Sequence, residues 1–184
     1  MKKIVLTFGV LSGVVASLLM IGTIPMMHRI GFDKGLLVGY TAIVLSLLFV
    51  FFGIRSYREN VGGGTISFGK AFGVGILITL ISCVFYVVTW EILYFNFLPD
   101  FFDKWTTYAV EQLRASGAAQ AVIDAKIQEM KDMKVMMDNP FKNAAMVFLE
   151  PFPVGLLITL ISAAILKRKR KDFNAGSTVP VGAD

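Results

Sequence analysis

Four long apolar segments dominate the pattern of hydrophobic and polar positions along the chain. They cover residues 4–27, 35–54, 71–97 and 141–166. A helix rises about 1.5 Å per residue, so about 20 residues cross the ~30 Å hydrocarbon core of a bilayer. Lipid offers the backbone no hydrogen-bond partners, and such segments must therefore be helical. The pattern predicts an all-α polytopic membrane protein with four transmembrane helices.

The first segment also has a feature of a signal peptide, because Lys2 and Lys3 supply a positive N-terminal region. Its apolar run, however, exceeds the roughly 7–15 residues of a signal-peptide core, and no small-residue cleavage site closes it. We therefore expect an uncleaved signal anchor that serves as the first span.

The composition agrees with a location in the lipid bilayer. Apolar residues make up 55% of the 184 residues and charged residues 17%, whereas a soluble domain carries about 25% charged residues. The mean hydropathy is +0.68, and this positive value also indicates a chain that is apolar on average. The polar surface is too small for a water-soluble particle of this length.

Basic residues predict the orientation of the spans. Most of those near the predicted spans fall on one side of the membrane, at Lys2, Lys3, Arg55, Arg58, Lys70 and 167–171. The other side carries Arg29 and Lys34 in a short loop, and a longer loop at 98–140 in which acidic residues balance the basic ones. Positive residues favour the cytoplasmic side, so both termini are expected there. The net charge of +5 then reflects topology, and no nucleic-acid partner is expected.

The loop 98–140 is the one sizeable segment outside the predicted spans. Its apolar positions recur at helical spacing on both sides of Ser116-Gly117, which predicts two amphipathic helices on the extracytoplasmic side. The helices could stand off the membrane, or lie in its interface with Phe101, Phe102 and Trp105 as anchors. Alternatively, they pack on each other and on the bundle. The segment 172–184 is expected to be a disordered cytoplasmic tail.

Small residues predict close helix packing. Residues 72–82 and 152–162 read FGVGILITLIS and FPVGLLITLIS, and differ only at their second and fifth positions. We interpret these repeated segments as a packing face of Gly, Thr and Ser, although inverted repeats also occur in secondary transporters. Such faces serve contacts within a bundle or between protomers. The candidate glycines are Gly9, Gly13, Gly35, Gly39, Gly69, Gly73, Gly75 and Gly155.

Glu91 and Glu150 are the residues best suited to chemistry within the predicted spans. An ionisable group at membrane depth is costly and marks a functional site by default. Pro151 and Pro153 follow Glu150 and remove two helix donors, which leaves carbonyl oxygens free beside the carboxylate. Such a site could bind a cation or relay a proton. Alternatively, the last helix begins at Pro151 with Glu150 at its positive end, and Glu91 lies at headgroup level beside Trp90.

No motif predicts a cofactor or a metal ion. Residues 64–70 fit the Gly-x-x-x-x-Gly-Lys part of a P-loop, but Ala71 replaces the hydroxyl that would hold magnesium. Cys83 is the one cysteine and His28 the one histidine, which excludes an internal disulfide and a histidine cluster. Because no Ser/His/Asp set occurs either, we do not expect an enzyme.

The order of motifs resembles a family. Arg55-Ser-Tyr-Arg-Glu-Asn is followed by Gly-Gly-Gly-Thr-Ile-Ser-Phe-Gly-Lys-Ala-Phe before the third span, the loop ends at Asn139-Pro140, and the last span closes on Ile-Ser-Ala-Ala-Ile-Leu-Lys-Arg-Lys. Over about Lys2 to Lys171 the chain resembles a bacterial four-span inner-membrane family catalogued as a domain of unknown function. The resemblance implies a bacterial inner membrane and no catalysed reaction, and it assigns no functional residues. The loop helices here are rich in Met and Ala, and less acidic than that family leads us to expect.

These observations favour a non-enzymatic membrane protein, an accessory or scaffold subunit that presents its outer loop. Its expected partners are the lipid bilayer and either a second copy of the chain or another membrane protein. The main alternative is a small proton- or cation-linked transporter or channel that uses Glu91 and Glu150. A third hypothesis is a lipid-handling protein whose aromatic loop helices lie in the interface.

Overall fold

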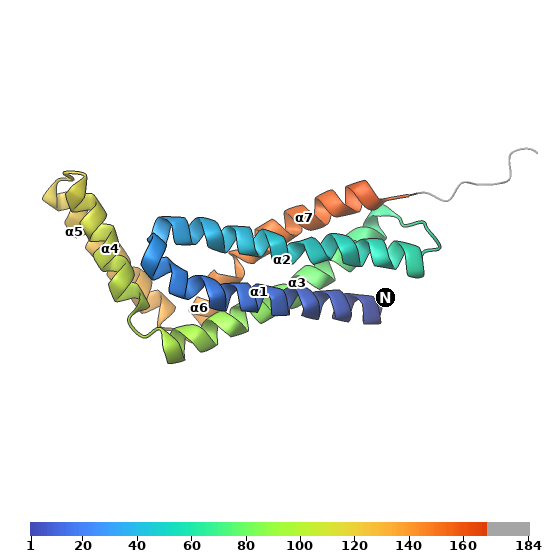
Figure 1. Ribbon diagram of the computed structural model, residues 1–184, viewed down its shortest axis with the longest axis horizontal. Helices are drawn as coiled ribbons and strands as arrows, with labels where there is room; N and C mark the ends of the chain where they lie inside the picture. The colour runs from blue at the N-terminus through green and yellow to red at the C-terminus, as the bar shows by residue number, and fades with distance from the viewer. Residues whose placement is uncertain (169–184) are drawn as a thin grey trace, which may run out of the picture.

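The computed structural model describes residues 1–168, apart from the side chains of residues 25–30 and 32–33. Within this range the chain forms seven helices (Figure 1): α1 (Lys2–Ile30), α2 (Phe32–Asn60), α3 (Phe68–Phe97), α4 (Phe101–Ala115), α5 (Gln120–Met137), α6 (Pro140–Phe148) and α7 (Pro151–Leu166). The predicted tail at 172–184 lies outside the described residues.

The predicted fold class is confirmed. Four stretches are long and apolar enough to cross a membrane: Lys2–Ile24, Lys34–Asn60, Phe68–Phe97 and Pro140–Leu166. In the described part of the chain the only strand-like pairing is an isolated bridge between Ile66 and Arg168. The two helices predicted in the loop, separated at Ser116-Gly117, are α4 and α5, and Gly117 adopts the positive φ of 74° that ends α4.

The helices divide into a bundle and a hairpin (Figure 1). Helices α1, α2, α3 and α7 run side by side, while α4 and α5 extend from one end of the bundle at a steep angle. We call this the hairpin end. The opposite end, where the chain begins and α7 finishes, is the terminal end. Helix α6 connects the hairpin to α7 and packs against α3.

The predicted fourth span consists of two helices. Helix α6 ends at Phe148 and α7 begins at Pro151. Pro151 and Pro153 have no backbone N–H, so they cannot donate to the carbonyl groups one turn earlier, and a continuous helix would leave those carbonyls unpaired. Leu149 and Glu150 instead donate to carbonyls of the last turn of α6, at 3.1–3.3 Å. The break therefore follows from the proline spacing.

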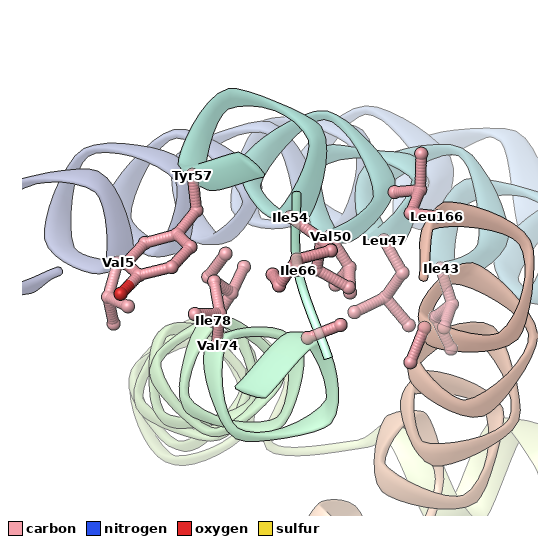
Figure 2. Packing of buried hydrophobic residues seen from close by; sticks show 12 residues of the cluster. Val5, Ile43, Leu47, Val50, Ile54, Tyr57, Ile66, Val74, Ile78 and Leu166 are labelled. Carbon is pink, nitrogen blue, oxygen red and sulfur yellow. The ribbon is translucent and has the colours of Figure 1, made fainter. Parts of the chain in front are cut away.

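Helix α2 supplies the main apolar face of the bundle core (Figure 2). Its buried side chains recur every three or four residues, at Ile43, Leu47, Val50, Ile54 and Tyr57. They meet buried residues of α3 and α7, among them Val74, Ile78 and Leu166. This spacing places one continuous stripe of α2 against its neighbours. The outward face of α2 is apolar too, with Leu37, Leu45 and Phe52 exposed, as a membrane span requires.

Two of the predicted small-residue positions bring α1 close to α3. A Cβ atom on Gly9 would lie 2.9 Å from the Ile81 side chain, and one on Gly13 would lie 2.5 Å from Phe85. One turn further along α1, Ser17 shares a 2.7 Å hydrogen bond with Thr89. Because both helices run in the same direction, each four-residue step on α1 matches a four-residue step on α3.

The repeated segments pack against each other, with α3 and α7 antiparallel. A Cβ atom on Gly75 would lie 2.8 Å from the Thr159 side chain, and Gly155 faces Thr79 in the same way. The two threonine hydroxyls lie 3.1 Å apart and are fully buried. The contact is thus reciprocal: each helix offers a glycine to the threonine of the other.

The remaining candidate glycines do not make contacts of this kind. A Cβ atom on Gly39, Gly69 or Gly73 would meet nothing within 4 Å in the described structure. Gly35 is buried near the hairpin end, where it lines a cavity together with Gly39. The motif alone therefore does not distinguish packing positions from open ones.

Adding a single methyl group tests the packing. We expect Gly13→Ala and Gly155→Ala each to destabilise the bundle by about 1–3 kcal/mol, because the methyl group overlaps a neighbouring side chain. Gly73→Ala is the matched control and should be neutral or stabilising by up to ~1 kcal/mol, since its methyl group enters open space. Thermal unfolding in detergent micelles measures all three. An equal response of the three variants would contradict the described packing.

Candidate functional site

A cavity of about 430 Å³ lies at the hairpin end. All elements except α7 contribute to its wall, which is mainly apolar. The aromatic, methionine and acidic side chains of this wall include Tyr40, Tyr86, Trp90, Phe101, Trp105, Met133, Met137, Met146 and Glu150. Both tryptophans of the sequence belong to this wall. Ring surfaces and flexible thioethers together form a surface that adapts to an apolar guest.

Glu150 lies in the wall at the junction of α6 and α7. It is the only charged residue among the described lining residues. The Tyr86 hydroxyl donates to Glu150 Oε2 at 2.9 Å. No ion pair between described side chains involves Glu150. The site is therefore a carboxylate held by one phenol inside an apolar chamber.

The backbone at Glu150 and the proline at position 153 explain why this carboxylate does not cap α7. Glu150 has helical dihedral angles, φ −76° and ψ −58°, and not the extended ones typical of a capping residue. A residue that precedes a helix commonly accepts hydrogen bonds from the amides of the second and third helical positions. The third position here is Pro153, which has no N–H, and Glu150 makes no side-chain cap hydrogen bond. Pro151 itself is buried and Pro153 is exposed. The prolines leave the carboxylate available to Tyr86 and the cavity.

A hydrogen-bond network links α3 to the α5–α6 corner beside the cavity. Trp90 Nε1 donates to Asn143 Oδ1 at 3.1 Å, and Asn143 Nδ2 donates to the Met137 carbonyl at 2.9 Å. Asn143 is fully buried, at 0% exposure. The Tyr94 hydroxyl donates to Asp138 Oδ1 at 3.1 Å. These bonds fix the position of the Trp90 indole in the wall.

The three aromatic residues predicted as loop anchors pack against the bundle. Phe102 is 3% exposed and belongs to a cluster with Tyr94 and residues of α5 and α6. Phe101 contacts Trp90 edge to face, with ring centroids 5.3 Å apart. The ring centroids of Trp105 and Phe102 are 5.5 Å apart. The first residues of α4 therefore pack on the end of the bundle, while the rest of the α4–α5 hairpin extends away from it (Figure 1). Phe102 offers almost no surface to a partner.

The α4–α5 hairpin is closed by an ion pair. Lys134 Nζ donates to both oxygens of Asp103 at 2.8 and 2.9 Å. The hydrogen bonds with Asp103 raise the pKa of Lys134 above its ordinary value. Since the pair is exposed, it fixes the pairing of α4 with α5 more than it stabilises the fold.

Glu91 and Glu150 are not brought together in one site. Glu91 lies on α3 one turn and a half beyond Tyr86, and it does not line the cavity. Its Oε1 atom is buried and has no hydrogen-bond partner among the described residues. The structure thus places Glu150 in a chamber and Glu91 at a separate position.

Sequence reasoning missed Tyr86 and Asn143. Each is a polar side chain within an apolar segment, and that was the available signal. Their partners, Glu150 and Trp90, are 64 and 53 positions away in the chain, so the pairing requires the three-dimensional arrangement. The described residues contain no group of three or more His, Cys, Asp or Glu side chains placed to hold a metal ion.

Comparison with known proteins identifies a family. A family model with the description "Protein of unknown function (DUF4199)" matches residues 7–168. This confirms that the motifs quoted above belong to a domain of unknown function. No curated protein matches the chain, and no solved structure matches it.

Removing the Asn143 side chain tests the network beside the cavity. We expect Asn143→Ala to destabilise the protein by about 1–3 kcal/mol, because Trp90 Nε1 and the Met137 carbonyl lose their buried partner. The tryptophan emission should also shift. Asn96→Ala is the control: Asn96 is exposed and bonds only within its own helix turn, so little change is expected. Chemical unfolding followed by tryptophan fluorescence gives both readouts, and equal stabilities would argue against the network.

Proposed function

The chain belongs to the DUF4199 family of unknown function, and we propose that this integral membrane protein binds an amphiphilic molecule in the cavity at its hairpin end. Its role is then lipid handling and not catalysis. The cavity itself carries this proposal, because its wall joins a large apolar surface to one carboxylate.

The size and the lining of the cavity suit such a ligand. Small-molecule sites commonly enclose about 300–1,000 Å³ and combine apolar walls with a few polar groups. The lining extends along α1 from Ala16 to Ile24, a rise of about 12 Å. An apolar chain segment fits along this length, while Glu150 and the phenols address a polar head.

The membrane orientation proposed from the basic residues places the cavity at the outer side. Arg55, Arg58, Lys70 and Lys167 gather at the terminal end, where Arg58 also donates to the Leu166 carbonyl at 3.4 Å. Trp90, Tyr94 and Trp105 lie at the opposite end, as expected of residues at a membrane–water boundary. With cytoplasmic termini in a bacterial inner membrane, the cavity faces the outer leaflet.

An accessory or scaffold role is the second candidate, and a different observation favours it. Val135 is 74% exposed and Met136 is 41% exposed, both on α5 and outside the cavity wall. Large apolar side chains on a surface outside the bundle suit a second copy of the chain or another membrane protein. Transport through both glutamates has less support, because Glu91 does not line the cavity.

Filling the cavity tests the proposed function. Gly39 lines the cavity and has open space around its Cβ position, so Gly39→Phe should occupy the volume that a ligand would use. We expect native mass spectrometry of protein extracted from its own membranes to show a retained amphiphile, reduced about tenfold or more in this variant. Gly73→Phe is the control, since its side chain enters open space away from the cavity. Equal retention in both variants, or none in the wild type, would contradict the proposal.

A further inference from the structure

We propose that the head group of the ligand is a cationic amine, either a primary or a quaternary ammonium, held by Glu150 and the surrounding rings. This inference rests on the proposed function, because it names the chemistry of the molecule that the cavity binds.

The charge of the site points to a cation. A carboxylate in an apolar chamber is costly unless it is paired. The described lining contains no lysine, arginine or histidine that could pair with Glu150. Its one hydrogen bond in the described structure comes from the neutral Tyr86 hydroxyl, at 2.9 Å. The N-terminus of α7, which Glu150 precedes, adds only about half a positive charge. A ligand ammonium supplies the full charge that the wall lacks.

The backbone geometry keeps the carboxylate directed at the ligand. Tyr86 occupies Oε2, and the missing N–H of Pro153 prevents the usual capping contact with α7. Glu150 Oε1 is then available to a cation inside the cavity. The Pro-x-Pro sequence therefore acts as a positioning device for this side chain.

The rings of the wall complement an ammonium group as well. Tyr40, Tyr86, Trp90, Phe101 and Trp105 line the same chamber. Aromatic faces attract cations, most strongly where water is excluded. The Glu150 carboxylate would repel an anionic head group, and the described wall contains no basic side chain that could pair with it. The site therefore selects an amine-bearing amphiphile over an acidic one.

Binding of two matched probes tests the inference. The probes are dodecyltrimethylammonium and dodecyldimethylamine oxide, which share the alkyl chain and differ in net charge at neutral pH. Because both tryptophans line the cavity, their emission reports binding to the purified full-length protein in a neutral maltoside detergent. We expect the wild type to bind the ammonium probe more tightly. Glu150→Gln should weaken ammonium binding by about tenfold to a hundredfold and change amine oxide binding much less, because that head group carries no net charge.

Glu91→Gln is the matched control, since it makes the same change on a neighbouring helix outside the cavity. It should bind both probes as the wild type does. Retained amine oxide binding in Glu150→Gln shows that the cavity is intact, so a loss of ammonium affinity is not caused by misfolding.

Two further outcomes separate the inference from the proposed function. Equal binding of both probes by the wild type, or unchanged ammonium binding in Glu150→Gln, overturns the cationic head group while leaving amphiphile binding in place. Binding of neither probe overturns both.

A lipid competition identifies the source of the amine. Native mass spectrometry with equal amounts of phosphatidylethanolamine and phosphatidylglycerol should show Glu150-dependent retention of the ethanolamine lipid if the ligand is a membrane lipid. Glu150-dependent binding of the alkylammonium probe alone indicates a free amphiphilic cation. Each result supports the shared ammonium chemistry. Preferential retention of phosphatidylglycerol would overturn it.

Discussion

The break in the last span is the constraint on which the functional end of the molecule depends. Helix α7 has 16 residues, fewer than the roughly 20 that a membrane crossing needs, so α6 must complete the span. The prolines that end α6 also place Glu150 between two helices, and Pro153 removes one of the two amides that a capping side chain would use. The break between α6 and α7 thus places Glu150 in the cavity wall and also lets α6 contribute Met146 and Val147 to that wall.

At the terminal end a different principle operates. Lipid is as apolar as the side chains it would replace, so helices gain little from burying Leu or Ile and associate through close packing and hydrogen bonds. Helices α3 and α7 meet this requirement because they are antiparallel and each places a glycine against a threonine of the other: Gly75 against Thr159, and Gly155 against Thr79. The bridge between Ile66 and Arg168 continues that register beyond the ends of both helices. The bundle is therefore firmly closed at one end and hollow at the other.

Sequence reasoning gave correct predictions where the solvent leaves few alternatives. The apolar segments had to be helices, and Ser116-Gly117 had to interrupt the loop. Glycine spacing was less informative, because Gly13 packs against Phe85 whereas Gly73 faces open space. The site was predictable only in part. Glu150 stood out as a charge in an apolar span, but the phenol that holds it and the aromatic wall around it come from distant segments, and no local pattern records that proximity.

The hydroxyl pairs also imply an order of assembly during synthesis. Ser12 contacts the Ser46 carbonyl at 2.8 Å and the Ser82 hydroxyl at 3.0 Å, so the first three helices can satisfy these groups among themselves. The hydrogen bond between Thr79 and Thr159 can form only after Thr159 has been synthesised, 80 residues later in the chain. At a translation rate of about 5–20 residues per second, that interval is about 4–16 s. During it, the Gly75–Thr79 face of α3 is an open, small-residue surface in the membrane. The α4–α5 hairpin must reach its final side of the membrane before α7 can cover that surface.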